Sequence, residues 1–163
     1  MTFEEIYAAY SPRVYRLCRG YVRDADWAAD LTQEVFVAVW QHLAGFRGEA
    51  AISTWVFRIA TNTCLRQVGR EQRRATTPTA PEDFPANLAA EPPDPGPQER
   101  LDALYRAIGE LAEADRLLIG LVLEAVPYPE IAAIVGISEG NVRVRLHRIK
   151  EKLTTRIASY GTV

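Results

Sequence analysis

The chain has 163 residues, of which 48% are hydrophobic and 25% charged, a composition that excludes both an intrinsically disordered chain and a membrane-embedded protein. No segment approaches the roughly 20 consecutive apolar residues that cross a bilayer. The first residues, MTFEEIYAAY, also lack the basic and then apolar order of a secretion signal, so a cytoplasmic location is expected. The formal net charge of −2 excludes a generally basic nucleic-acid binder, although positive charge gathers locally between residues 58 and 74 and between residues 143 and 156.

Apolar side chains recur at helical spacing through residues 1–75, without strand-like alternation. An opening amphipathic stretch gives way to a helix that we expect to start after Ser11, with Pro12 in its first turn. A long helix follows over residues 31–43, with Trp40 widening its apolar stripe, and another helix comes after a loop that contains glycines. The spacing predicts a small N-terminal helical domain.

The long helix with its stripe over residues 31–43 carries an acidic face opposite that stripe. That face holds Asp26, Asp30, Gln33, Glu34 and Val37. Acids near a helix N-terminus suit the helix dipole. The same residues also suit docking of a basic protein partner, and the pattern alone supports both interpretations equally.

The segment FRGEAAISTWVFRIATNTCLRQVGREQRR combines aromatic, amide and arginine side chains. This combination suits single-stranded DNA, because unstacked bases stack on rings and accept hydrogen bonds while arginines hold phosphates. Trp55 lies on the apolar stripe, which favours a place in the core. Asn62 lies less clearly on that stripe and is the better candidate for contact with a base.

Residues 76–98, TTPTAPEDFPANLAAEPPDPGPQ, hold seven of the ten prolines and several acids. We expect no helix or strand to run through them, because proline removes a backbone donor and fixes its own backbone angle. They are predicted to form a flexible, acidic, Pro-rich linker. The fold expected is therefore all-α, with two small helical domains, residues 1–75 and 99–163, on either side of this linker.

The sequence PEIAAIVGISEGNVRVRLHRI is typical of a helix-turn-helix. Gly136 allows the left-handed backbone that ends a first helix, and Ser138 is a good N-cap for a second. At about 100° per residue, the apolar side chains of the second helix fall within one narrow arc. Opposite that arc lie Gly140, Val144 and His147, a centre of small and apolar residues that admits the helix close to base edges in a DNA groove.

Polar side chains flank this centre on both sides. Asn141 and Arg148 lie on one side and Arg143 on the other, whereas Arg145 lies nearer the core edge, where it would reach phosphates. An exposed amphipathic helix without DNA contact is the alternative. The arrangement of faces favours DNA contact.

The two cysteines, Cys18 and Cys64, each lie in a helical pattern without a Cys or His close by in the sequence. We expect two separate, buried and reduced thiols rather than a disulfide or a metal site, since metal sites need clustered ligands. No cofactor is predicted.

Taken together, the two halves resemble bacterial RNA polymerase sigma factors of the two-domain extracytoplasmic-function class. The resemblance rests on DLTQEVFVAVW (residues 30–40), FRGEAAISTWVFRIATNTCL (residues 46–65) and the long segment over residues 111–153. It covers nearly everything outside the linker. The linker would correspond to the connector that threads toward the active-site cleft of the polymerase.

The resemblance implies binding to core RNA polymerase, through its β′ and β subunits, and to promoter DNA, with no catalysis by the chain itself. Contact with the polymerase is implied for Asp30, Gln33 and Glu34. Capture of the melted −10 strand is implied for Phe46, Arg47, Gly48, Glu49, Arg58, Asn62 and Arg66. Contact with the −35 duplex is implied for Asn141, Arg143, Val144, Arg145, His147 and Arg148. A regulatory anti-sigma factor is a further expectation, whereas a small-molecule substrate and membrane insertion are not expected.

One departure from the family pattern lies at Pro127-Tyr128-Pro129, where a Ser or Thr cap is usual, and it affects where the first helix of the helix-turn-helix begins. The sequence leaves three alternative functions. A helix-turn-helix regulator that acts without polymerase would leave the acidic face without a purpose. An enzyme is disfavoured because the sequence has no catalytic motif. The third alternative is a sigma-like protein that only sequesters partners.

Overall fold

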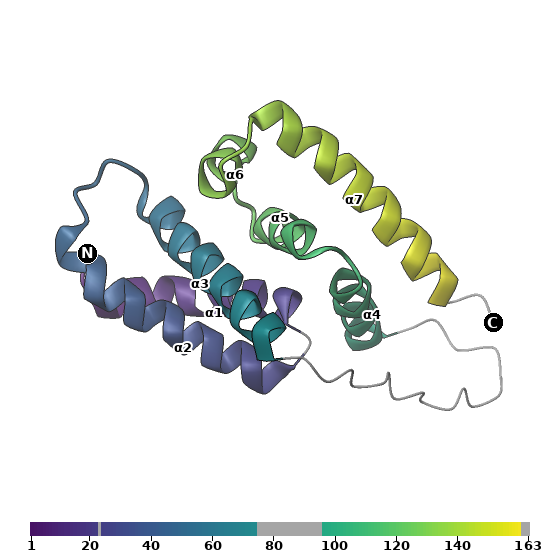
Figure 1. Cartoon of the computed structure of the whole chain (residues 1–163), viewed down its shortest axis with the longest axis horizontal. Helices are drawn as coiled ribbons and strands as arrows, with labels where there is room; N and C mark the ends of the chain where they lie inside the picture. Colours follow the sequence, from purple (N-terminus) through teal and green to yellow (C-terminus); the bar gives the residue numbers. More distant parts are fainter. Residues whose placement is uncertain (23, 75–95, 161–163) are drawn as a thin grey trace.

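The computed structural model describes residues 1–22, 24–74 and 96–160, and these fold into α-helices and one short 3₁₀ helix without any strand (Figure 1). The elements are α1 (Phe3–Tyr21), α2 (Ala25–His42), η1 (Leu43–Gly45), α3 (Ile52–Arg74), α4 (Pro97–Gly109), α5 (Glu113–Leu123), α6 (Tyr128–Val135) and α7 (Glu139–Tyr160). The predicted all-α fold is confirmed. None of the described helices is both long and apolar enough to cross a bilayer.

Helix α1 is one continuous helix, which corrects the prediction of a new start after Ser11. It begins at a capping box, in which the Thr2 hydroxyl accepts from the Glu5 amide at 3.3 Å and the Glu5 carboxylate accepts from the Thr2 amide at 2.7 Å. Pro12 lies inside the helix on its exposed side. An interior proline costs about 3 kcal/mol, and burial of the apolar side chains on either side of Pro12 offsets this cost.

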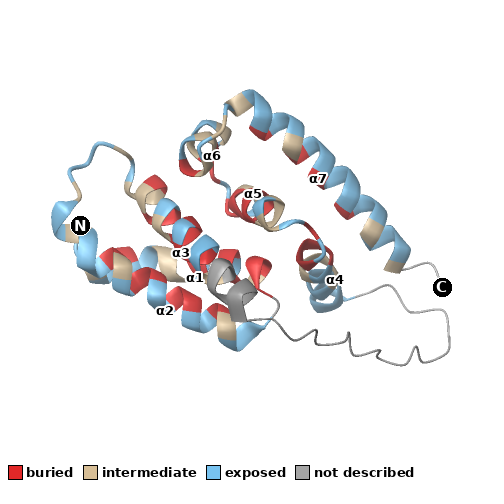
Figure 2. Cartoon of the chain, in the orientation of Figure 1, coloured by how far each residue is buried: buried red, intermediate tan, exposed pale blue. Residues whose placement is uncertain are grey.

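The N-terminal domain forms around a core shared by α1, α2 and α3. Asp24 caps α2 by accepting from the amides of Asp26 at 2.7 Å and Trp27 at 3.4 Å, so this acid has a structural role. Side chains without solvent exposure come from each helix, among them Val14, Val35 and Phe57. The apolar stripe predicted for residues 31–43 is buried except at its edges (Figure 2).

The two cysteines are buried and free, as the sequence predicted, and they meet in this core, which the sequence did not predict. The sulfur atoms of Cys18 on α1 and Cys64 on α3 are 3.9 Å apart, and both thiols are free and buried. Hydrogen bonding to Cys18, together with burial, raises the pKa of Cys64, so this thiol stays protonated. The helical pattern gave each cysteine a buried place, but the contact depends on how α1 crosses α3.

The C-terminal domain contains α4 to α7 and confirms the predicted helix-turn-helix. Helix α6 ends at Gly136, whose φ of 75° is left-handed, and the Ser138 hydroxyl accepts from the Asn141 amide at 3.2 Å as an N-cap. The four apolar residues predicted to face the core of this domain are all buried, namely Val142, Leu146, Ile149 and Leu153.

Helix boundaries differ from the predictions at two prolines. Helix α4 begins at Pro97, one residue before the predicted end of the linker, because proline suits the first position of a helix. Helix α6 begins at Tyr128 with Pro127 as its N-cap, which settles the start that the Pro127-Tyr128-Pro129 sequence left open. Residues 76–95 of the predicted linker lie outside the described residues.

The two domains pack against each other. Helix α1 contacts α5 and α4, and α3 contacts α6, so these helices join the two halves into one apolar core. Among the described residues, the main contacts of α7 are with α4, α5 and α6, and the main contacts of α2 are with α1, α3 and η1. Figure 1 shows α2 and α7 on opposite outer sides of this arrangement. The sequence offered no prediction of how the two domains would sit in the free chain.

Candidate protein and nucleic-acid interfaces

The acidic face predicted on α2 is exposed and continues into a large aromatic side chain. Asp30, Gln33 and Glu34 are all exposed. The Glu34 carboxylate accepts a short hydrogen bond from the Gln67 amide group on α3, so its position is fixed relative to the neighbouring helix. Trp40 lies on the same side of α2 and is 66% exposed.

The exposure of Trp40 corrects the prediction that it widens the apolar stripe. At about 100° per residue, Trp40 falls close to Gln33 and well away from the centre of the buried face, so counting faces for this residue would have found it. An exposed tryptophan beside carboxylates is typical of a protein interface rather than of a solvated helix face. The sequence reasoning therefore missed one member of this surface.

The loop before α3 is held by a ring contact at its first residue. The centroids of Phe46 and Trp55 are 4.9 Å apart, which packs the loop onto α3. Gly48 has a φ of 72°, a conformation that residues with a side chain rarely adopt. Arg47 and Glu49 are exposed on this loop. Phe46 and Gly48 thus shape the loop, while Arg47 and Glu49 are free to meet a ligand.

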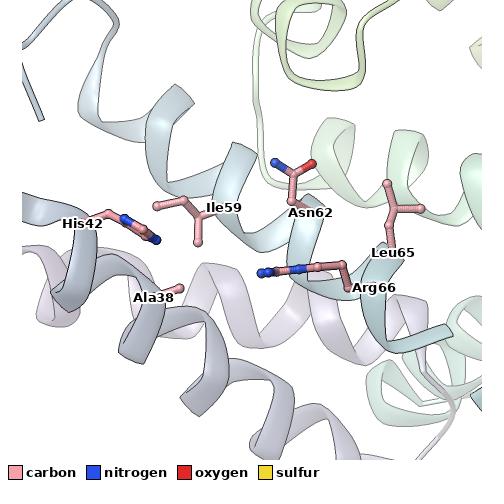
Figure 3. Close-up of a pocket in the computed structure, with 6 residues that line it drawn as sticks. All are labelled: Ala38, His42, Ile59, Asn62, Leu65 and Arg66. Carbon is pink, nitrogen blue, oxygen red and sulfur yellow. The ribbon is translucent and has the colours of Figure 1, made fainter. Parts of the chain in front are cut away.

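A groove of about 610 Å³ lies between α2 and α3 (Figure 3). It is lined by Ala38, His42, Ile59, Asn62, Leu65 and Arg66. In Figure 3, His42 from α2 and Arg66 from α3 reach into the groove from its two sides. Hydrogen-bond donors on an open groove with apolar walls suit a strand of nucleic acid, whose phosphates and bases need both kinds of contact. His42 was not predicted, and only its place in the last turn of α2 brings it here.

On α7, the side chains predicted to read a duplex are presented to solvent. Val144 is 51% exposed, and Asn141, Arg143, His147 and Arg148 are exposed around it. The Arg143 guanidinium is paired with Glu139 at 2.7 Å and lies 5.1 Å from the centre of the Tyr128 ring. Contacts on two sides limit the rotamers of Arg143, which reduces the entropy lost when it binds a base.

Arg145 takes a different place from its neighbours on α7. Its guanidinium donates to the Asp115 carboxylate on α5 at 2.7 Å, and the residue is only partly exposed. This ion pair ties α7 to α5 within the C-terminal domain. Contact of Arg145 with DNA phosphates stays a prediction, whereas its contact with Asp115 is an observed anchor of the helix.

The structure brings the residues predicted for the −10 strand close to the helix-turn-helix domain. The Arg58 guanidinium donates to the backbone carbonyl of Ala133 on α6 at 3.4 Å. Asn62 and Leu65 line a cavity of about 160 Å³ together with Ile134, Val135 and other residues of the C-terminal domain. The predicted readers Asn141, Arg143, Val144, His147 and Arg148 do not join them, because they lie on the exposed outer face of α7.

A buried carboxylate at the domain boundary was not predicted. Glu124, at the end of α5, is 6% exposed and forms a two-point contact with Arg16 of α1, at 2.7 Å and 2.9 Å. Arg13 donates to the backbone carbonyl of Glu124 at 2.5 Å. Hydrogen bonding to Glu124 raises the pKa of Arg16, so the guanidinium stays charged. In the sequence, LVLEAVP gives Glu124 the appearance of an ordinary surface acid.

Comparison with known protein families assigns both halves of the chain. Residues 6–74 match Sigma-70 region 2, and residues 101–153 match Sigma-70 region 4. These two matches contain α2, η1, α3, α5 and α6, together with most of α1, α4 and α7.

Two curated relatives cover nearly all of the chain. It is 32% identical to the ECF RNA polymerase sigma factor SigE of Mycolicibacterium smegmatis, over 99% of this chain and 63% of that protein, so it spans less than two thirds of that relative. It is 31% identical to the ECF RNA polymerase sigma-E factor of Escherichia coli, over 95% of this chain and 86% of that protein.

Two solved structures share the fold of this chain. The sigma factor RpoE from Bartonella quintana, in complex with the anti-sigma factor NepR, has a TM-score of 0.72 at 22% identity over 96% of both chains. CnrH, in complex with the cytosolic domain of CnrY, has a TM-score of 0.68 at 20% identity over 96% of this chain and 88% of CnrH. At this identity the likeness concerns the fold alone.

Proposed function

The chain belongs to the sigma-70 family, in its extracytoplasmic-function class, and we propose that it binds core RNA polymerase and directs it to specific promoters. The N-terminal domain binds the polymerase and the melted −10 strand, and the C-terminal domain binds the −35 duplex. The part played by the chain is recognition rather than catalysis. Its place of action is the cytoplasm, where polymerase and promoters meet.

The observation that carries this proposal is the outer face of α2. Trp40, Asp30 and Glu34 are all exposed at different turns of α2, which gives the outer part of this helix both apolar and acidic character. A regulator that acted on duplex DNA alone would have no use for such a surface on a domain separate from its helix-turn-helix. Because aromatic side chains dominate interface energies, Trp40 is expected to be the anchor of polymerase binding.

The −10 strand is proposed to lie in the groove between α2 and α3. Asn62 offers a donor and an acceptor to one unstacked base, and Arg66 and His42 hold phosphates from the two walls. Extrusion of a base from the duplex costs on the order of a few kcal/mol, which stacking and phosphate contacts offset. The captured strand thereby stabilises the melted promoter.

The −35 duplex is proposed to receive α7 in its major groove. Val144 at the centre meets the base edges, and Arg143 and Arg148 on its flanks donate to them. With a formal net charge of −2, the free chain binds DNA weakly. Polymerase holds both domains on one promoter, so the second contact forms at a high effective concentration and two weak contacts act as one strong contact.

A protein antagonist is proposed as a further partner. Both solved structures of similar fold contain an anti-sigma factor or the cytosolic domain of a partner protein. An antagonist that covers the outer face of α2 would block access to polymerase, and one that covers α7 would block access to DNA.

Co-elution with purified core polymerase in size-exclusion chromatography tests the first step of this function. The chain is expected to form a one-to-one complex that Trp40→Ala weakens. A chain that elutes separately from core polymerase at micromolar concentration, while still folded, would overturn the proposal.

A further inference from the structure

Two prolines enclose the first residue of the helix-turn-helix. Pro127 is the N-cap of α6, and the helix begins with Tyr128 followed by Pro129. Neither proline removes a hydrogen bond of the helix, because the first amides of a helix have no intrahelical acceptor. Pro129 also restricts the backbone of the residue before it. The backbone of Tyr128 is therefore confined, and the place of its ring is well defined.

The Tyr128 ring connects the core to the second helix of the motif. The residue is only partly exposed and packs against the apolar core. The Arg143 guanidinium of α7 lies over the same ring, with its central carbon 5.1 Å from the ring centre. A guanidinium is attracted to the face of an aromatic ring, because that face carries negative charge. A ring anchored in α6 thus holds a side chain that belongs to the reading face of α7.

Glu139 holds the same guanidinium from within α7. Its carboxylate accepts a hydrogen bond from Nη2 of Arg143 at 2.7 Å, one helical turn further along. A guanidinium carries several N–H donors in one plane, and this ion pair engages only one of its nitrogens. Attraction to the ring is not a hydrogen bond, so the other N–H groups remain available to the edge of a base. Both contacts are therefore compatible with the reading of a base by Arg143.

The charge of Glu139 has opposite effects on affinity and on specificity. Its side chain is 42% exposed, in the first turn of the helix that is proposed to enter the groove. A carboxylate there suits the helix dipole, but it repels the phosphates of every duplex alike. If it also orients Arg143, the preferred sequence gains relative to all others. Specificity is a difference between affinities, so a residue that weakens all binding can still sharpen it.

Arg148 provides a contrast on the other flank of Val144. It is exposed, and no side chain in the described part of the structure makes an ion pair, hydrogen bond or ring contact with its guanidinium. Arg148 therefore loses more side-chain entropy than Arg143 when it binds a base. The two arginines differ in how they are held, which makes Arg148 an internal reference for Arg143.

We propose that Tyr128 and Glu139 are positioning residues that hold Arg143 in the orientation from which it reads the −35 duplex. Discrimination at one base pair then depends on two side chains that need not touch a base. The inference rests on the proposed function, which places α7 in the major groove. Loss of either contact leaves Arg143 present but free to rotate, and the added ordering on binding lowers preference at that base pair.

The test measures base preference of the full chain assembled with core polymerase. Competition between duplexes with single changes across the −35 element gives a discrimination factor at each position, and Arg143→Ala and Arg148→Ala identify the position that each arginine reads. Tyr128→Leu removes the ring and keeps an apolar side chain against the core. It is expected to lower discrimination at the Arg143 position roughly two- to fivefold, the factor that corresponds to a cation–π contact at an exposed site. Discrimination at the Arg148 position is expected to stay unchanged.

Two further variants separate the ring from other causes. Tyr128→Phe keeps the ring and is expected to restore wild-type discrimination at the Arg143 position. Tyr160→Leu is the matched control, because this ring also lies under an arginine, with the guanidinium carbon of Arg106 4.6 Å from its centre. Tyr160 is at the opposite end of α7, so its loss is expected to leave every position unchanged. Circular dichroism melting checks the fold, and if Tyr128→Leu is unfolded then Glu139→Ala decides alone.

Glu139→Ala is expected to move affinity and specificity in opposite directions. All duplexes are expected to bind more tightly, because a negative charge near the phosphates is gone. Discrimination at the Arg143 position is expected to fall, whereas that at the Arg148 position is expected to hold. A purely structural role of Glu139 would instead lower affinity for all sequences and leave the ratios between them unchanged.

Two results would overturn this inference alone. One is wild-type discrimination at the Arg143 position in both Tyr128→Leu and Glu139→Ala, and the other is an equal loss at the Arg143 and Arg148 positions. Failure of the proposed function is seen in other measurements, namely absence of assembly of the wild-type chain with core polymerase or an unchanged preference in Arg143→Ala. Either of these would overturn the proposed function and the inference together.

Discussion

Asn62 and Arg66 stand one turn apart on α3 and bring different chemistry to the same groove. The amide of Asn62 both donates and accepts, as the edge of a base requires, whereas the guanidinium of Arg66 only donates and carries charge, as a phosphate requires. Position alone does not separate these roles. Substitution separates them, because the affinity lost with a base contact depends on the DNA sequence, whereas the affinity lost with a phosphate contact depends on the salt concentration.

Asn62→Ala is expected to weaken capture of the melted strand by about 1 kcal/mol, the typical net value of a hydrogen bond. The side chain is exposed, so the melting temperature is expected to stay near that of the wild type. Permanganate footprinting of the promoter with polymerase bound measures the melted region, and a duplex carrying only the −35 element serves as the control. Equal loss in both assays would contradict the base-capture role.

Arg143→Ala and Arg148→Ala are each expected to relax preference at one position of the −35 element by about 1–3 kcal/mol. Lys150→Ala, an exposed lysine on the same helix, is the matched control and is expected to weaken all sequences alike. Competition binding against duplexes with single base changes measures the preference. An unchanged preference in both arginine variants would remove these residues from the reading face.

Arg145→Ala is expected to act on stability rather than on sequence preference, because Arg145 pairs with Asp115 of α5. The arginine side chain is 37% exposed, so solvent screens the pair and the loss is expected to be about 1 kcal/mol or less. Urea unfolding of the variant measures this change. A shift in base preference without loss of stability would instead place Arg145 among the readers.

At the scale of the element, α2 and α7 each present one face to the core and another to a partner. On α2 the outer face is acidic and aromatic, and on α7 it is small and apolar with a basic margin. Both helices lie on the outside of the packed domains (Figure 1). Each face is therefore available to a partner without rearrangement of its own domain.

Trp40→Ala is expected to weaken binding to core polymerase by about 2 kcal/mol or more, as is typical of an interface anchor. The side chain is 66% exposed, so the substitution leaves the core of the domain intact. Leu123→Ala on α5, another exposed apolar residue, is the control and is expected to leave binding unchanged. Fluorescence titration of core polymerase gives both affinities, and equal values for the two variants would contradict a special role for Trp40.

Helix faces and caps could be predicted from the sequence because they depend on local spacing. The turn at Gly136, the cap at Ser138 and the buried arc on α7 follow from residue type and a period of 3.6, and all agree with the structure. Continuity of α1 through Pro12 was not predicted, since tertiary burial outweighed a local signal. Contacts between helices, such as Cys18 with Cys64, depend on crossing geometry that spacing does not contain.

The candidate site was predictable to the same extent. The acidic face of α2 and the reading face of α7 were found by counting along single helices. The partners of Glu124 were not, because they lie 108 and 111 residues away in sequence and meet only when the two domains pack. His42 joined the groove for the same reason, through the crossing of α2 and α3.

At the scale of the whole molecule, the chain combines weak separate contacts into one specific function. The two faces proposed to bind DNA lie on different domains, and the net charge of −2 gives little general attraction to DNA. Core polymerase is the element that places both domains on one promoter. The account therefore predicts specific DNA recognition by the assembly rather than by the isolated chain.

Run-off transcription by core polymerase, with and without the chain, tests this central claim most directly. Promoters selected from genomic DNA by the assembled complex serve as templates, and the Trp40→Ala chain serves as the matched variant. The account predicts transcripts that start at selected promoters only when the wild-type chain is present, and fewer transcripts with Trp40→Ala. Transcription that does not depend on the chain, or selection of the same DNA by the chain without polymerase, would contradict it.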